Sequence, residues 1–298
     1  MRQNKRPMNS YIAKFRDYLL LMRADKPIGI FLLLWPTLWA LWFASGGMPT
    51  LHVLLVFVGG TVLMRSAGCA INDFADRDFD PQVARTKARP LVTGRITPEE
   101  AVRCFVVIAL IAFGLLTSLK NTLAILWAIP AVLLAALYPF TKRVFAMPQA
   151  ILGLAFSAGI PMAYAAVLHR VEWAPVLHLV AANLCWVVAY DTLYAMADRE
   201  DDLRIGVKSS AILFGRHDLT LVALLHATSL LLLAHLGWSS GRGGLFFAAL
   251  AGAAALATAQ QHQIRKREPA ACLQAFLQNN YFGLIIFLGL ALDYAVVP

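Results

Sequence analysis

The sequence predicts an all-α membrane protein, a polytopic bundle of about nine transmembrane helices, and three observations support this. Hydrophobic residues make up 59% of the 298 residues and charged residues only 14%, whereas soluble domains carry about 25% charged residues. The apolar residues fall in blocks of about the 20 residues that a helix needs to cross a bilayer. Most Lys and Arg residues lie between these blocks. The composition therefore excludes a soluble enzyme and a disordered chain.

Nine apolar runs form the predicted spans, in chain order 28–44, 51–72, 101–118, 121–139, 148–168, 174–192, 219–238, 243–260 and 279–297. Helices and closed barrels satisfy their backbone hydrogen bonds in lipid, and runs such as Val53–Val58 lack the alternation of a barrel strand. We therefore expect one integral-membrane domain over 1–298, with 1–27 as a cytoplasmic or interfacial segment. Apolar residues in that segment recur at helical spacing, which is typical of a helix at the lipid headgroups; a plain cytoplasmic extension is the alternative.

The basic residues predict the orientation of these spans. If the N-terminus is cytoplasmic, the segments on that side hold 21 Lys and Arg residues and those on the opposite side three, Lys120, Arg170 and Arg242. Cytoplasmic loops of membrane proteins carry such an excess, so the C-terminus is expected on the opposite side. The net charge of +9 then needs no nucleic acid to explain it. The four cysteines include no CxxC pair and are expected to be small buried hydrophobes.

Nine of the 17 acidic residues lie in two short patches, INDFADRDFDP and YDTLYAMADREDD, each at the end of an apolar run. Each patch has oxygen ligands at the spacing of one helical stripe: Asn72, Asp76 and Asp80 at i, i+4 and i+8, and Asp191, Asp198 and Asp202 at i, i+7 and i+11. Pro81 marks the expected end of the first stripe. Oxygen ligands without His or Cys suit Mg²⁺, which prefers a few carboxylates together with phosphate oxygens. The inferred ligand is a magnesium-bound phosphate ester.

Basic residues near the two patches support phosphate binding. Arg65 lies inside the second run, about two turns before Asn72, and six others occupy loops on the same side: Arg77, Lys87, Arg89, Lys142, Arg204 and Lys208. The loop residues could equally be topology charges or ion-pair partners of the aspartates, whereas a charge inside a span such as Arg65 indicates function. A diphosphate site at the mouth of an apolar bundle predicts a lipid-tailed substrate, and prenyl diphosphates fit best. Their C–O bond ionises to an allylic cation once the diphosphate is neutralised in a water-excluding pocket.

The motifs NDxxDxxxD at 72–80 and DxxxD at 198–202 resemble those of the intramembrane aromatic prenyltransferases of quinone biosynthesis. Further blocks resemble the 4-hydroxybenzoate polyprenyltransferase branch of that superfamily: RADKPIGIFLLLWPTLWAL, KARPLVTGRIT, YPFTKR, MPQAILGLAFSAGIPMAYAA and DLRIGVKSSAILFG. The resemblance covers most of the chain. It implies Mg²⁺-dependent transfer of a polyprenyl chain from its diphosphate to the carbon ortho to the hydroxyl of 4-hydroxybenzoate. It also implies a role in ubiquinone biosynthesis, in the inner membrane of a bacterium, with the active site facing the cytoplasm.

The resemblance also implies roles for individual residues. Asn72, Asp76, Asp198 and Asp202 would hold the metal ions, supported by Asp73, Asp80 and Asp191. Arg65, Lys142 and Lys208 would bind the diphosphate, and Arg23 or Arg65 the carboxylate of the acceptor. Tyr138 and Tyr194 could stabilise the allylic cation or simply pack at the interface. Asp191 is the expected base for the ring proton.

Three alternatives remain at the level of sequence. Transporters also carry acidic residues in their spans, but these acids lie at the ends of spans and no convincing repeat relates the halves. CDP-alcohol phosphotransferases also use aspartates and a metal, but their Asp-Gly pattern is missing around Asp73. Within the superfamily, relatives use dihydroxynaphthoate, homogentisate, haem or glycerol phosphate acceptors. The choice of 4-hydroxybenzoate as the acceptor therefore rests on the resemblance.

Overall fold

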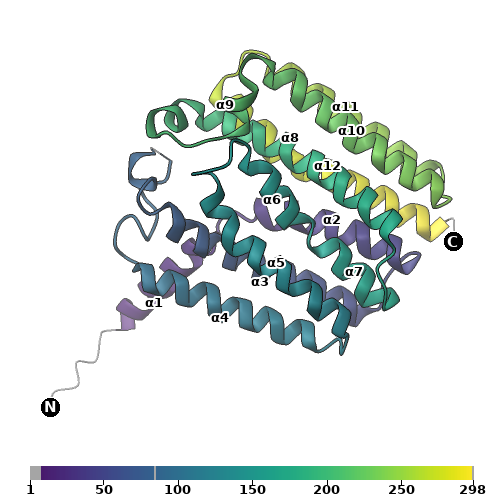
Figure 1. The fold of residues 1–298 in the computed structure, drawn as a ribbon, viewed down its shortest axis with the longest axis horizontal. Helices are drawn as coiled ribbons and strands as arrows, with labels where there is room; N and C mark the ends of the chain where they lie inside the picture. Colours follow the sequence, from purple (N-terminus) through teal and green to yellow (C-terminus); the bar gives the residue numbers. More distant parts are fainter. Residues whose placement is uncertain (1–7, 84, 297–298) are drawn as a thin grey trace.

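A computed structural model describes residues 8–83 and 85–296, and the described chain is an all-α bundle (Figure 1). Its helices are α1 (Met8–Leu21), α2 (Ile28–Ser45), α3 (Leu51–Asp76), α4 (Pro98–Thr117), α5 (Thr122–Thr141), α6 (Pro148–Ser157), α7 (Gly159–Leu168), α8 (Trp173–Ile205), α9 (Ser210–Phe214), α10 (Asp218–Ser239), α11 (Gly244–Gln263) and α12 (Pro269–Val296). Two short 3-10 turns follow α3 and α9, η1 (Asp80–Gln82) and η2 (Gly215–His217). In this part of the chain, nine helical segments are long and apolar enough to cross a membrane, which confirms the predicted fold class.

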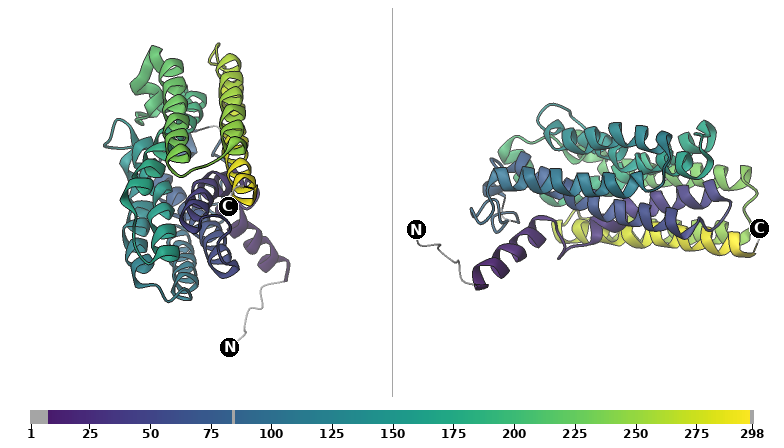
Figure 2. Two further views of the ribbon diagram at one scale, coloured as in Figure 1. Left: turned by 90° about the vertical axis from the view of Figure 1, so that its right-hand side faces the viewer. Right: turned by 90° about the horizontal axis from the view of Figure 1, so that it is seen from below.

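The spans run side by side along the long axis of the bundle, and α1 and the last turns of α12 lie at its opposite ends (Figures 1 and 2). Helices α10 and α11 follow one long edge and α4 follows the other (Figure 1). Helix α1 projects from one end of the bundle (Figure 2), and its apolar residues Ile12 and Phe15 are exposed. Its place at the lipid headgroups stays a prediction. The first seven residues of the predicted 1–27 segment lie outside the described residues.

Two spans extend well beyond their apolar runs. Helix α8 continues to Ile205, although its apolar run ends at 192, and α12 begins at Pro269, ten residues before its run. An apolar run predicts only the part of a helix that lies in the hydrocarbon of the membrane. The helix itself can continue beyond the run where its polar side chains find hydrogen-bond or ion-pair partners. On α8 such a partner is Asp218 of α10, which is fully buried and accepts hydrogen bonds from Arg199. The extension of α8 carries the second acidic patch.

The fifth span is divided into α6 and α7 at Ala158. Pro161 has no N–H to donate to the carbonyl of Ser157, so the regular ladder is interrupted there. At the start of α7, a Cβ on Gly159 would lie 2.7 Å from the Thr37 hydroxyl of α2. The break and the glycine together let α7 pack closely on α2.

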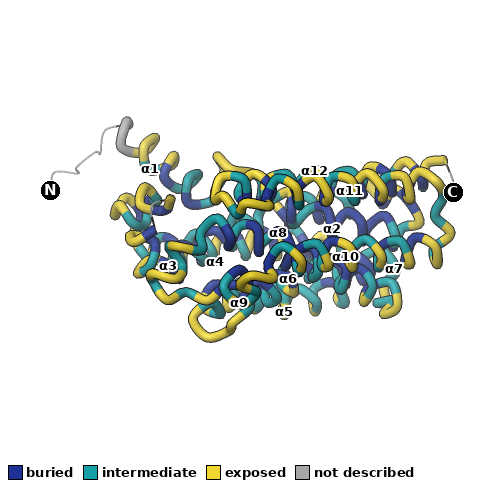
Figure 3. Tube along the Cα trace, turned by 90° about the horizontal axis from the view of Figure 1, so that it is seen from above, coloured by how far each residue is buried: buried dark blue, intermediate teal, exposed yellow. Residues whose placement is uncertain are grey.

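The core lies between α2, α8 and α12, where large aromatic side chains stack. Trp39 and Trp186 have ring centroids 5.3 Å apart, and Trp186 stacks on Phe282 at 5.5 Å. Helices α2 and α8 are the most buried spans, whereas α5 mostly faces outward (Figure 3). The four cysteines are free; Cys69 and Cys272 are buried as predicted, whereas Cys104 and Cys185 are half-buried. Residues of α2, α8 and α12 also line the cavity described below.

Candidate active site

A large cavity of about 1540 Å³ opens among α2, α3, α4, α5, α6, α8 and α12. Its walls on α4 and α5 are apolar, with side chains such as Val106, Phe113 and Leu133. Its polar lining comes from the α1–α2 connection, from α3 and α8 and from the α3–α4 loop, and it includes Arg23, Arg65, Asn72, Asp73, Arg85, Arg89, Asp191 and Tyr194. The cavity therefore joins a charged end to a long apolar compartment.

The last turns of α3 carry the first acidic motif. The Asn72 amide donates to Asp76 Oδ2 at 3.1 Å, and the other Asp76 oxygen is ion-paired with Lys142 from the end of α5. Asp73 Oδ1 accepts from Arg23 at 2.6 Å and lies 3.1 Å from Arg89. Its second oxygen is buried and has no hydrogen-bond partner.

Asp80 does not share the helical stripe of Asn72 and Asp76, so this part of the sequence prediction was wrong. Helix α3 ends at Asp76, and Asp80 begins the separate turn η1. The chain turns because the Asp80 carbonyl accepts from the Thr86 hydroxyl at 2.6 Å and its carboxylate pairs with Arg89 at 2.5 Å. Burial raises the pKa of Asp80 to about 6, against the opposing effect of the Arg89 guanidinium. Through Arg89, Asp80 still belongs to the same cluster as Asp73.

The second motif lies on a single helix, as predicted: Asp191, Asp198 and Asp202 are all in α8. Arg85 binds both oxygens of Asp198, at 2.6 and 3.4 Å, and its guanidinium lies 4.7 Å from the ring centroid of Tyr194. Arg85 and Arg89 come from the same loop, and each pairs with a different acidic motif. The loop thus connects the two motifs across the mouth of the cavity.

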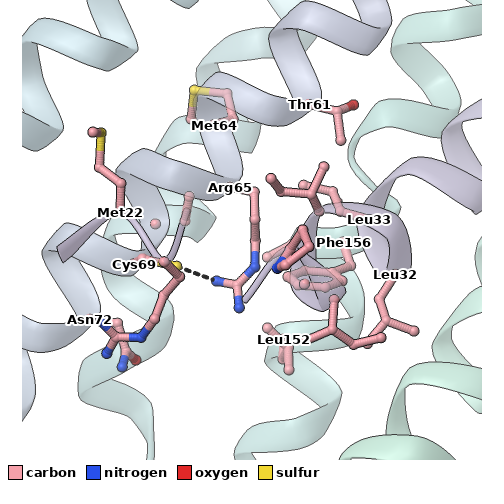
Figure 4. A pocket seen from close by; sticks show the side chains of 18 of the residues that line it. Met22, Leu32, Leu33, Thr61, Met64, Arg65, Cys69, Asn72, Leu152 and Phe156 are labelled. Carbon is pink, nitrogen blue, oxygen red and sulfur yellow. Dashed lines mark hydrogen bonds between the residues drawn. The ribbon is translucent and has the colours of Figure 1, made fainter. Parts of the chain in front are cut away.

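Arg65 lies deeper in the cavity and has no carboxylate within ion-pairing distance among the described residues. Its Nη1 donates to Cys69 Sγ at 3.1 Å, and the guanidinium lies 5.9 Å from the Phe156 ring (Figure 4). Its Nε is buried without a partner. Gly29 of α2 makes room for this group, because a Cβ there would lie 2.2 Å from Arg65 Nε. A guanidinium in this position is available to an anionic ligand.

Residues 33–287 match the UbiA prenyltransferase family. The chain belongs to this family. A 4-hydroxybenzoate octaprenyltransferase of Dechloromonas aromatica is 54% identical over 279 residues, 94% of each chain. One of Nitrosomonas eutropha is 55% identical over 284 residues, 95% of this chain and 99% of the relative.

Solved structures of UbiA homologues share the fold. One from Aeropyrum pernix K1, described as an apo structure, is 27% identical with a TM-score of 0.77, over 89% of this chain and 97% of that one. A homologue from Archaeoglobus fulgidus, described as bound to GPP and Mg²⁺, is 20% identical with a TM-score of 0.71, over 94% and 99% of the two chains. The latter likeness concerns the fold alone.

The site residues predicted for this family member fall into two groups. Arg23, Arg65, Asn72, Asp73, Tyr138, Asp191 and Tyr194 line the cavity. Six others lie outside the cavity wall: Asp76, Asp80, Lys142, Asp198, Asp202 and Lys208. Of these, Asp76 pairs with Lys142, Asp80 with Arg89, and Asp198 with Arg85. Lys208 instead donates to the Val144 carbonyl at 2.8 Å. The roles assigned to these residues stay predictions.

Arg85 is the residue that sequence reasoning missed. It lies two residues before the block KARPLVTGRIT and looked like one of many loop charges. The sequence did contain a signal: Arg85 and Arg89 lie four residues apart in one loop, so the loop offers one arginine for each of the two acidic motifs.

The donor set fits Mg²⁺ that is bound jointly with a substrate. In the described ranges, no three His, Cys, Asp or Glu side chains are close enough together to hold a metal by themselves. Mg²⁺ usually binds through one or two carboxylates plus waters and phosphate oxygens, so such a cluster is not required. The buried free oxygen of Asp73, next to Asn72 on α3, provides a donor of the required kind.

Proposed function

We propose that the protein transfers a polyprenyl group from polyprenyl diphosphate to the ring carbon ortho to the hydroxyl of 4-hydroxybenzoate, releasing diphosphate, in ubiquinone biosynthesis. The observation that carries the proposal is one cavity that combines an acidic, arginine-rich mouth, an apolar compartment and an unpaired guanidinium. These three parts suit a diphosphate, a prenyl tail and an acidic acceptor. Relatives named for this activity, at more than half identity over nearly the whole chain, support it.

The mouth of the cavity is the proposed diphosphate site. Asn72, Asp76, Asp198 and Asp202 would hold Mg²⁺, with Asp73 and Asp80 beside them; when bound, Mg²⁺ neutralises charge on the departing diphosphate. Arg85, Arg89 and Lys142 pair with Asp198, Asp80 and Asp76, and these three cations are the proposed partners of the phosphate oxygens. Lys208 is the weakest member of this set because a backbone carbonyl holds its ammonium group.

The apolar compartment between α4 and α5 is the proposed site of the prenyl tail. Its apolar walls would keep water away from an allylic cation and so protect it from hydrolysis. Tyr138 and Tyr194 also line the cavity, and their rings are the proposed stabilisers of that cation. In the free protein, the Arg85 guanidinium lies 4.7 Å from the Tyr194 ring centroid.

Arg65 is the better candidate for the acceptor's carboxylate, because Arg23 is already paired with Asp73 at 2.6 Å. A carboxylate next to Arg65 places the aromatic ring between this guanidinium and the diphosphate mouth. Asp191 lies in the same wall and interacts electrostatically with Arg65. Its carboxylate is the proposed acceptor of the ring proton after the new C–C bond has formed.

We also propose one integral-membrane domain over 1–298 in the inner membrane of a bacterium, with 1–27 as a cytoplasmic or interfacial segment. Helix α1 and the α3–α4 loop lie at one end of the bundle (Figures 1 and 2). This is the end that the excess of Lys and Arg assigns to the cytoplasm.

The test is product formation by purified protein in lipid, with 4-hydroxybenzoate and a prenyl diphosphate, detected by mass spectrometry. We expect a C-prenylated acid in the presence of Mg²⁺ and none with excess chelator. Absence of this product from folded protein, together with prenylation of dihydroxynaphthoate or homogentisate, would overturn the choice of acceptor. A series of prenyl diphosphates then gives the preferred chain length.

A further inference from the structure

Tyr190 of α8 carries a hydroxyl group that the proposed chemistry has not used. Its side chain is only 1% exposed and lies in the wall of the cavity. The hydroxyl is buried and has no hydrogen-bond partner. Because an unpaired buried hydroxyl destabilises a fold, it indicates a ligand that supplies the partner.

Packing holds the Tyr190 ring in this position. The ring lies edge-on to Trp186, with centroids 5.2 Å apart, and 6.0 Å from Phe276. Trp186 is fixed in turn, since its Nε1 donates to the buried Asn279 at 2.9 Å and its ring stacks on Phe282. The hydroxyl therefore cannot swing away to another partner without disturbing the core.

Tyr190 and Arg65 line the same cavity from different helices. Arg65 precedes Asn72 by seven residues on α3, and Tyr190 precedes Asp198 by eight on α8. At about 1.5 Å per residue, each lies roughly 10 Å along its helix from the acidic motif that follows it. Two buried donors without partners, Arg65 Nε and Tyr190 Oη, thus belong to one cavity.

We propose that the Tyr190 hydroxyl donates a hydrogen bond to a carboxylate oxygen of the aromatic acceptor whose charge Arg65 neutralises. The inference rests on the proposed function and adds a residue that discriminates carboxylated from uncharged phenols. A site built to hydrogen-bond a substrate group binds an analogue that lacks this group more weakly, because its own polar atoms are then left unpaired.

The decisive variant is Tyr190→Phe, which keeps the ring and removes the hydroxyl. Steady-state kinetics are measured in lipid with 4-hydroxybenzoate and with 4-methylphenol, which lacks the carboxylate, at saturating prenyl diphosphate. We expect KM for 4-hydroxybenzoate to rise about tenfold, the effect of losing one hydrogen bond to a charged group. The KM values for 4-methylphenol and for prenyl diphosphate should not change. Tyr164→Phe on α7 is the matched control, since Tyr164 is 2% exposed and lies outside the cavity wall.

Each outcome is informative. Equal KM values for Tyr190→Phe and the wild type, or an equal rise with both acceptors, would overturn the proposal while the function stands. A lower melting temperature of ligand-free Tyr190→Phe would also overturn it, because a hydroxyl without a partner adds nothing to the stability of the free protein. If the wild type makes no product from 4-hydroxybenzoate, the proposed function fails and this inference fails with it.

Discussion

Replacing Gly29 with alanine is expected to disable Arg65 without changing its charge. A Cβ at this position would lie 2.2 Å from Arg65 Nε, 2.4 Å from Nη2 and 2.7 Å from Cζ. Ordinary contact begins at 3.4 Å, so the guanidinium must retreat by about 1.2 Å. A displacement of about 1 Å in a positioned group can reduce activity about 100-fold, and a lost hydrogen bond to a charged group costs about 1.5–3 kcal/mol.

The expected result is a rise of about 10- to 100-fold in KM for 4-hydroxybenzoate, with little change in KM for prenyl diphosphate. Stability should change less, because overpacking costs about 1–3 kcal/mol and alanine gains up to about 1 kcal/mol over glycine in a helix. The assay is product formation over a range of acceptor concentrations, with the melting temperature measured in parallel.

Gly114→Ala on α4 is the matched control. A Cβ at Gly114 meets no atom within 4 Å, and the residue lies outside the cavity wall. This variant makes the same chemical change in a helix and should keep wild-type kinetics. If Gly29→Ala binds and prenylates the acceptor like the Gly114 variant, Arg65 does not hold the acceptor from the position described.

Three further variants test the mouth of the cavity and its support. Asp198→Ala should lower kcat at least about 100-fold in the mass-spectrometric assay while the protein stays folded; a nearly normal rate removes Asp198 from the site. Arg85→Ala should raise KM for prenyl diphosphate about tenfold and leave KM for the acceptor unchanged, since its only described ion pair is with Asp198; equal effects on both substrates would contradict this role. Asp218→Ala leaves Arg199 and Arg267 without their shared buried carboxylate and should reduce stability by about 2–4 kcal/mol, after allowance for the partial exposure of both arginines. Thermal unfolding measures this loss of stability, with Asp78→Ala at an exposed aspartate as the control, and equal melting temperatures of the two variants would refute the prediction.

The membrane spans were predictable because apolar composition over about 20 residues is a local property. The stripe of Asp191, Asp198 and Asp202 was predictable for the same reason, since one helix sets their spacing. The position of Asp80 was not, because Thr86 and Arg89 pull the chain out of the helix after Asp76.

Packing between distant helices was equally hidden in the sequence. The space that Gly29 leaves for Arg65 depends on contact between α2 and α3, and the unpaired hydroxyl of Tyr190 depends on the walls of α8 and α12. A glycine or a tyrosine in an apolar run carries no local sign of either role.

The pairing of the α3–α4 loop with both acidic motifs has a consequence for ligand binding. Arg89 neutralises the buried Asp73 and Asp80, and Arg85 neutralises the half-buried Asp198, so these charges are compensated in the free protein. A divalent cation that takes these carboxylates frees both guanidinium groups for an anion, and an anion that attracts the guanidinium groups frees the carboxylates for a cation. Binding of either ligand therefore removes the free-energy cost of breaking these ion pairs for the other ligand, and this coupling is reciprocal. Arg85 and Arg89 thus give one loop a contact with each motif, and the diphosphate and its metal ions are expected to bind together.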